Sequence, residues 1–233
     1  YNDIIYVSAI NYEEEYSEVI AFTLQDLKQI WRTVLDRKFA STSPVINELD
    51  KKIYIPCTDG YNIRGQSSSL IYSLEMQNGD IDWIREVDGA VFGPLLYHNG
   101  LLFYQNFYCA STDPGTTSES GDIGCINTSN GTVKWIKRMA YSFLQGSTSN
   151  LFPTILGDQI LVPNTYLKFK ENEKMEVGQT CIFYSFNLQS GNITKEIIKK
   201  ECLLPALSVD KSSYYLTYTE IDGNTTIQKL EAF

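Results

Sequence analysis

The sequence predicts an all-β fold made of repeated antiparallel units of about four strands each. Three observations carry this prediction. A tryptophan recurs every 52 residues, at Trp31, Trp83 and Trp135. A proline precedes a short apolar segment four times, at Pro44, Pro94, Pro153 and Pro205. The 233 residues also include 16 tyrosines and 11 phenylalanines, and aromatic side chains suit the pleated surface of a sheet.

Each repeat is interpreted as four strands, A to D. Strand A follows the proline and strand B is the β-rich run after it, such as KKIYIPC or GLLFYQN. Strand C carries a small residue followed by a large apolar one, at Ala21-Phe22, Ser73-Leu74, Cys125-Ile126 and Ser185-Phe186. Strand D begins near the tryptophan, and Lys195 stands in its place in the fourth copy. Lys195 therefore predicts weaker packing after that copy.

A glycine is expected in the turn between strands C and D, at Gly79, Gly131 and Gly191. Leu27 stands there in the first copy and predicts a different turn. The stretch Leu24–Leu35 has apolar residues near helical spacing, but its alignment with three turn-plus-strand copies favours a turn and a strand.

The first copy supplies strands B to D, the next three supply A to D, and the fifth supplies A to C. Four-stranded units of about fifty residues are typical of β-propeller blades. We expect one domain over residues 1–233, with blades near 1–40, 41–90, 91–148, 149–200 and 201–233. The ring of four to five blades is then partial, has two reduced blades, or is completed by missing residues or another chain.

The spacing small–apolar–x4–Gly–x3–Trp resembles the repeat of the PQQ-like propellers, the quinoprotein alcohol dehydrogenase-like family. The acidic position of that repeat is degenerate here, with Thr23, Glu75, Asn127 and Asn187. The resemblance implies that the tryptophan packs between neighbouring blades and that the glycine permits a tight turn. In the enzymes of the family, a quinone, a calcium ion and a catalytic Asp occupy a complete ring. This chain has no adjacent cysteine pair and no Asp that matches, so no cofactor is expected.

Composition excludes several classes of function. The net charge of -9, from 28 acidic and 19 basic residues, disfavours nucleic acid as a partner. No apolar run is long enough to span a bilayer. One histidine, His98, and no CxxC pair make a zinc site unexpected, and no partners for a catalytic triad are visible. Glu13, Glu14 and Glu15 lack the spacing of a calcium loop, so a solvated turn is favoured over a metal site.

The B–C connections are expected to be long and to share one face of the blades. They span Asn11–Glu18, Thr58–Ser67, Asn106–Asp122 and Asn164–Gln179. Variable loops on a rigid scaffold commonly carry function. The predicted binding face comprises Tyr12, Glu14, Tyr16, Tyr61, Arg64, Tyr108 and Tyr166. The alternative is that these are solvated loop side chains.

Five cysteines allow two readings. Bridges Cys109–Cys125 and Cys181–Cys202 are one hypothesis, and free buried thiols are the other. Sequons at Asn127, Asn130, Asn192 and Asn224 mildly favour a secreted, glycosylated protein. A glycosidase-sensitive mass shift after expression in a glycosylating host would test that hypothesis.

These observations favour a non-catalytic module that binds a protein or glycan partner, or serves structural assembly, outside the cytoplasm. Self-assembly or completion by another chain is part of this interpretation. The alternative is a quinoprotein-type oxidoreductase or a degenerate relative of one, which a quinone bound to the purified protein would reveal.

Overall fold

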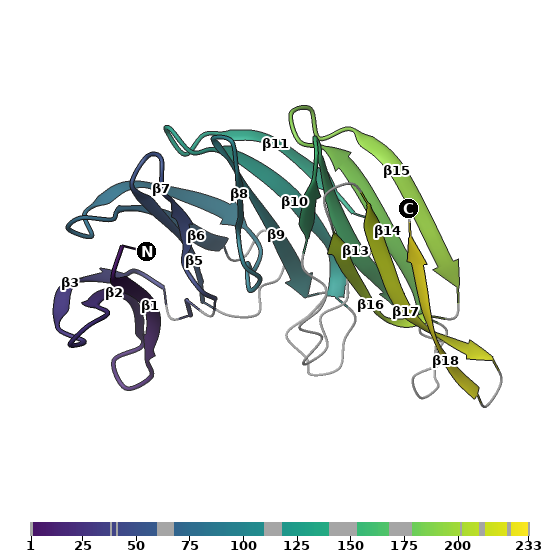
Figure 1. The fold of residues 1–233 in the computed structure, drawn as a ribbon, viewed down its shortest axis with the longest axis horizontal. Coiled ribbons are helices and arrows are strands. Elements are labelled where there is room, and N and C mark those ends of the chain that lie inside the picture. Colours follow the sequence, from purple (N-terminus) through teal and green to yellow (C-terminus); the bar gives the residue numbers. More distant parts are fainter. Residues whose placement is uncertain are drawn as a thin grey trace. The chain divides into compact units, whose positions relative to one another are not determined.

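The computed structural model describes residues 2–37, 39–40, 42–59, 68–109, 118–139, 153–167, 179–200, 202–209, 213–222 and 225–232. In these ranges every regular element is a β-strand (Figure 1). The predicted all-β class is confirmed. Leu24–Leu35 forms a turn followed by strand β3, so the strand interpretation of this stretch is also confirmed.

The strands form five antiparallel sheets. Sheet 1 contains β1 (Ile4–Asn11), β2 (Tyr16–Thr23) and β3 (Gln29–Leu35). Sheet 2 contains β4 (Val45–Asn47), β5 (Lys52–Thr58), β6 (Ser68–Glu75) and β7 (Ile81–Asp88). Sheet 3 contains β8 (Leu96–His98), β9 (Leu101–Cys109), β10 (Ser118–Asn127) and β11 (Val133–Arg138). Sheet 4 contains β12 (Thr154–Leu156), β13 (Gln159–Leu167), β14 (Gln179–Asn187) and β15 (Ile193–Lys200). Sheet 5 contains β16 (Cys202–Val209), β17 (Tyr214–Asp222) and β18 (Thr225–Ala232).

The chain divides into two compact units. Unit 1 comprises Tyr1–Thr117 and Gly121–Ile136, which hold sheets 1 and 2 and most of sheet 3. Unit 2 comprises Ser118–Ser120 and Lys137–Phe233, which hold sheets 4 and 5. Packing is described below within each unit.

The turn between the C and D strands has the same geometry in four sheets. The amide of Gly79 donates to the carbonyl of Glu75 at 2.9 Å, and Leu27 makes the equivalent bond to Thr23 at 3.1 Å. Leu27 has a φ of 54°, beside 75° for Gly79, 67° for Gly131 and 66° for Gly191. The expectation of a different turn at Leu27 was wrong. Leucine accepts the left-handed conformation here, at a steric cost that glycine avoids.

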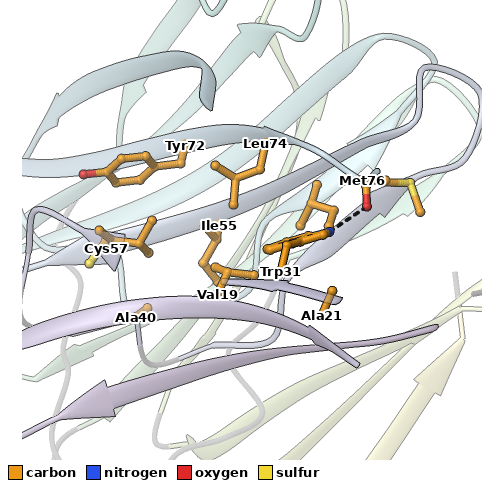
Figure 2. Packing of buried hydrophobic residues seen from close by; sticks show 11 residues of the cluster. Val19, Ala21, Trp31, Ala40, Ile55, Cys57, Tyr72, Leu74 and Met76 are labelled. Atoms are coloured by element: carbon orange, nitrogen blue, oxygen red, sulfur yellow. Dashed lines mark hydrogen bonds between the residues drawn. The ribbon is translucent and has the colours of Figure 1, made fainter. Parts of the chain in front are cut away.

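Sheets 1 and 2 are joined by Trp31 (Figure 2). Its indole Nε1 donates to the carbonyl of Met76 at 3.0 Å, and its ring lies in a buried cluster with Ala21 and Leu74. A Cβ added to Gly79 would stand 2.5 Å from Cε3 of Trp31. The glycine therefore serves two purposes, since it permits the turn and leaves room for the tryptophan of the preceding sheet.

Sheets 2 and 3 repeat this joint. Trp83 Nε1 donates to the carbonyl of Thr128 at 2.8 Å, and a Cβ on Gly131 would meet the Trp83 ring at 2.8 Å. Trp135, in sheet 3, is buried and contacts the ring of Phe103 with centroids 5.9 Å apart.

The small residue of strand C has a packing purpose. Ala21 is the cross-strand neighbour of both Tyr6 and Trp31, whose ring centroids lie 5.9 Å apart across it. Ser73 lies in the same way between Tyr54 and Trp83, at 5.8 Å. A larger side chain in the middle of this row would separate the two aromatic rings.

The equivalent row in sheet 4 has no aromatic residue at either of the two flanking positions. Ser185 lies there between Leu161 and Lys195. A cavity of about 10 Å³ is lined by these three residues together with Leu216 of sheet 5 and Phe183, Tyr184 and Ile197. Looser packing at Lys195 is thus visible as unfilled space between sheets 4 and 5.

Candidate functional site

The candidate site is the edge of unit 1 where strands B and C meet. Tyr12–Glu15 connects β1 and β2, and is the B–C connection that the structure describes in full. The side-chain Oδ1 of Asn11 accepts hydrogen bonds from the amides of Glu13 and Glu14, each at 3.1 Å. This capping makes a tight turn, so the expected long loop over Asn11–Glu18 was wrong. Tyr12 lies in the turn with 75% of its surface exposed.

Beside the turn, three side chains on β2 and β3 form a polar cluster. Arg32 forms an ion pair with Glu18 and donates to the hydroxyl of Tyr16, whose ring centroid lies 5.7 Å from the guanidinium carbon. Asn11 Nδ2 also donates to the Tyr16 hydroxyl at 3.1 Å. Hydrogen bonding to Glu18 raises the pKa of Arg32. We call Tyr12, Glu14, Tyr16, Glu18 and Arg32 the B–C cluster.

A second network links sheets 1 and 2 along this edge. Arg37 follows β3, and its Nη1 lies 2.5 Å from Oδ2 of Asp59. Its Nη2 donates to Ser68 at 3.3 Å and lies 3.9 Å from the carboxylate of Glu86. The Arg37 carbonyl accepts from the Ser17 amide at 3.1 Å. Arg37 thus fixes the position of the two sheets at this edge.

Buried polar side chains brace the crossings from strand D to strand A. Ser17 Oγ accepts from the amide of Ala40 at 2.8 Å. Ser69, at the equivalent position of sheet 2, donates to the carbonyl of Gly89 at 2.8 Å and accepts from the amide of Val91 at 3.0 Å. These bonds satisfy buried backbone groups, so the edge is a preorganised scaffold.

Two buried tyrosines in unit 1 differ in whether their hydroxyl group has a hydrogen-bond partner. The Tyr72 hydroxyl accepts from the Asp36 amide at 3.0 Å, and burial raises the pKa of Tyr72 to about 12. The Tyr104 hydroxyl is buried, and has no hydrogen-bond partner among the described residues. Its ring fills the space above Gly124, where an added Cβ would lie 2.2 Å from Cζ of Tyr104.

We expect Tyr72→Phe to lower the free energy of unfolding by about 1 kcal/mol, because the Asp36 amide loses its partner. Tyr104→Phe is expected to be neutral or stabilising, because it removes a desolvated hydroxyl. Urea unfolding of the two variants measures the difference. Equal losses of stability in both variants would contradict the assignment of a hydrogen bond to the Tyr72 hydroxyl and of none to the Tyr104 hydroxyl.

The structure brings together part of the predicted binding face. Tyr12, Glu14 and Tyr16 lie side by side around the first turn, with Tyr16 on strand β2 rather than in a loop. Tyr108 and Tyr166 lie on strands β9 and β13, since these strands extend further than expected, and their side chains lie outside the described residues. Tyr61 and Arg64 also lie outside them.

Sequence reasoning missed Arg32 and Arg37. Arg32 directly follows Trp31, the tryptophan of the repeat. Because side chains alternate along β3, Arg32 points away from the core. That signal was present in the sequence. Nothing in the sequence paired Arg37 with Asp59 and Glu86, because these contacts join two sheets.

The Cys109–Cys125 bridge is contradicted. Cys125 is a free, buried thiol whose pKa is raised by burial to about 12. It lies near the end of β10 that pairs with the start of β9, whereas Cys109 ends β9. The two therefore lie at opposite ends of one hairpin. Cys57 is also free and buried. The side chains of Cys181 and Cys202 lie outside the described residues.

Three of the four sequons lie in C–D turns, each at the edge of its own sheet opposite to the B–C connection. Asn130 and Asn192 are exposed, while Asn127 is half-buried and donates through Nδ2 to Thr132 at 3.1 Å. Asn224 lies outside the described residues. Glycosylation stays a prediction, and Asn130 and Asn192 are the positions that the geometry leaves accessible.

The described part of the chain holds no group of three His, Cys, Asp or Glu side chains that could bind a metal ion. It also holds no helix long and apolar enough to cross a membrane.

No protein-family model and no curated protein sequence matches this chain. Solved structures do match. BamB from Moraxella catarrhalis has a TM-score of 0.55 at 12% identity, over 97% of this chain and 63% of that one. Quinohemoprotein alcohol dehydrogenase from Comamonas testosteroni has a TM-score of 0.58 at 12% identity, over 94% of this chain and 38% of that one. Pyrococcus horikoshii acylaminoacyl peptidase has a TM-score of 0.55 at 11% identity, over 99% of this chain and 36% of that one.

At these identities the likeness shows the fold alone, and it confirms the β-propeller class. This chain spans less than two thirds of the length of each of the three proteins. One fold hosts many activities, so function must be argued from the site.

Proposed function

We propose that the chain is a non-catalytic propeller module that binds a protein or glycan partner through the B–C cluster. The observation that carries the proposal is the exposed Tyr12 on a capped turn, next to Tyr16 and Arg32. Tyrosine and arginine are the residue types that most often dominate binding energy at interfaces. A rigid turn also lowers the entropy lost when a partner binds.

The charge of the cluster indicates the chemistry of the partner. Glu13 and Glu14 are exposed around Tyr12, while the guanidinium of Arg32 is engaged by Glu18 and Tyr16. A partner with hydrogen-bond donors or basic groups around an apolar contact for Tyr12 would complement this surface. The exposed sequons Asn130 and Asn192, in the C–D turns of their sheets, support an extracytoplasmic setting as part of the proposal.

The test compares four immobilised proteins, the wild-type chain and the variants Leu49→Ala, Tyr12→Ala and Arg32→Ala, by quantitative capture from extracellular fluid and on a glycan array. The wild-type chain and the matched control Leu49→Ala are expected to retain the same ligands. Tyr12→Ala is expected to lose at least about tenfold in affinity for them, as a hot-spot residue does. Leu49 is as exposed as Tyr12 but lies in the A–B turn of sheet 2, at the other edge. If Tyr12→Ala and Arg32→Ala both retain the ligands as well as the wild-type chain does, the B–C cluster is excluded as the binding site.

A further inference from the structure

The sequence contains three Asn-Gly pairs, at Asn78-Gly79, Asn99-Gly100 and Asn130-Gly131. An Asn-Gly pair is chemically reactive, because the backbone nitrogen of the glycine can attack the side-chain amide of the asparagine, and no Cβ on the glycine hinders the approach. The attack needs a glycine amide that is only weakly hydrogen-bonded and a backbone that has room to move. The three pairs differ in both respects.

Two of the pairs are held in C–D turns by short hydrogen bonds. The amides of Gly79 and Gly131 each donate at 2.9 Å to the backbone carbonyl four residues earlier. The side chains of Asn78 and Asn130 are held as well, since each Oδ1 accepts from the amide two residues further on, at 3.1 and 3.0 Å. Both reacting groups of these pairs are therefore engaged in the folded chain, and the reaction must first break their hydrogen bonds.

Tryptophan rings cover the glycines of the same two pairs. A Cβ added to Gly79 would lie 2.5 Å from the ring of Trp31. A Cβ added to Gly131 would lie 2.8 Å from the ring of Trp83. Both glycines are buried. The turn backbone cannot rearrange unless the tryptophan first moves out of the joint, so the contact that joins neighbouring sheets also protects these two pairs.

The third pair lies in the turn between β8 and β9 and is held differently. The amide of Gly100 donates to the hydroxyl of Tyr97 at 3.3 Å, a longer bond than those of the other two glycines. Asn99 is exposed, and its Nδ2 lies 3.0 Å from Nε2 of His98. A Cβ added to Gly100 would meet nothing nearer than Thr128 Oγ1 at 3.9 Å. Strand β8 is three residues long, so this hairpin can open locally without disturbing the rest of the sheet.

We propose that Asn99 is the site at which the folded chain deamidates spontaneously, and that the folded structure protects Asn78 and Asn130. The nitrogen of Gly100 gives up its proton to solvent and forms a bond to Cγ of Asn99. The bond from Cγ to Nδ2 breaks, and Nδ2 leaves as ammonia with a proton from solvent. Water then opens the cyclic imide at either carbonyl, which gives aspartate or isoaspartate. The proposal goes beyond the proposed function, since it uses neither the B–C cluster nor its partner.

Isoaspartate at this position is expected to weaken the joint between sheets 2 and 3. It adds a carbon to the backbone of the turn, which moves the Gly100 amide away from the Tyr97 hydroxyl. The ring of Tyr97 stacks on Tyr54 at a centroid distance of 6.2 Å, and Tyr54 stacks on Trp83 at 5.8 Å. The modified turn therefore acts directly on the aromatic row that packs in this joint.

Peptide mapping by mass spectrometry tests the proposal. The chain is produced in a host that does not glycosylate proteins, so that Asn130 is unmodified, and is incubated folded at physiological temperature and mildly alkaline pH. We expect Asn99 to deamidate at least about tenfold faster than Asn78 or Asn130. In guanidinium chloride the hydrogen bonds and the tryptophan contacts are lost, so the three rates should agree within about threefold.

Two variants at Asn99 complete the test. Asn99→Gln should not form the early product, because its longer side chain closes a ring far more slowly. Asn99→Asp carries the charge of the product on a normal backbone, so the isoaspartate fraction should unfold at a lower urea concentration than fresh Asn99→Asp.

Four results would overturn the proposal. Folded Asn78 or Asn130 could react as fast as Asn99, or the same difference in rate could persist in guanidinium chloride. The early product could also form in Asn99→Gln. An isoaspartate fraction as stable as fresh Asn99→Asp would refute the effect on the joint.

Discussion

Trp31→Ala is expected to lower the free energy of unfolding by about 3–5 kcal/mol, the cost typical of deleting a large buried aromatic side chain. Trp31 fills the joint between sheets 1 and 2, contacts the ring of Tyr6, and donates its Nε1 to the Met76 carbonyl. Alanine would leave a cavity lined by both sheets, and the Met76 carbonyl would keep only the longer hydrogen bond from the Tyr6 hydroxyl, at 3.4 Å. Urea unfolding followed by circular dichroism measures the loss.

Two further variants divide this effect into its causes. Trp31→Phe keeps most of the buried ring but removes the donor, so a loss of about 1–3 kcal/mol is expected. Ile30→Ala, on the neighbouring and 44% exposed residue of β3, is the matched control and should change stability by less than about 1 kcal/mol. If Trp31→Ala costs no more than Ile30→Ala, the tryptophan does not hold the sheets together.

Gly79→Ala is expected to lower the free energy of unfolding by roughly 2–4 kcal/mol, the sum of a conformational and a steric cost. The φ of 75° is unfavourable for any residue with a Cβ. The added methyl would also stand 2.5 Å from Trp31 Cε3 and 2.6 Å from Thr33 Oγ1, so the joint must open. Thermal or urea unfolding gives the magnitude.

Two other positions separate conformation from contact. Gly100 has a φ of 78°, but an added Cβ would meet nothing nearer than Thr128 Oγ1 at 3.9 Å. Gly100→Ala should therefore show the conformational cost alone, about 1 kcal/mol. Leu27→Gly is expected to stabilise the chain by up to about 1 kcal/mol, because it relieves the same strain. A Gly79→Ala cost equal to that of Gly100→Ala would show that the contact with Trp31 contributes nothing.

Much of the fold could be predicted from the repeats. The recurring tryptophan, proline and small–apolar pairs placed the strands of five sheets, because an antiparallel unit needs the same side-chain alternation and the same turns each time it occurs. The error at Leu27 shows the limit of that reasoning. A steric preference of about 1–2 kcal/mol was treated as decisive, but this turn keeps its own hydrogen bonds, from the Leu27 amide to Thr23 and from the Thr23 amide to Lys28, in spite of it.

The candidate site was less predictable. Tyr12, Glu14 and Tyr16 could be predicted to lie close together because they cluster in sequence around one turn. Arg32 and Arg37 were not, because their partners Glu18, Asp59 and Glu86 come from other strands or another sheet. The proposed Cys109–Cys125 bridge failed for a related reason, since the strand lengths that separate the two residues are set by pairing and not by their spacing in the chain.

The sequence by itself determined the repeated architecture, since hydrophobic alternation, turn residues and a periodic tryptophan are local properties that each copy expresses alike. Only the tertiary structure decided which faces these units bury. Met76 is covered because Trp31 reaches it, and Leu24 is exposed although its local geometry is the same. Burial depends on what lies opposite a side chain, and neighbours across a sheet interface are separated in sequence by about fifty residues. For that reason the surface that we assign to binding becomes visible only in the folded chain.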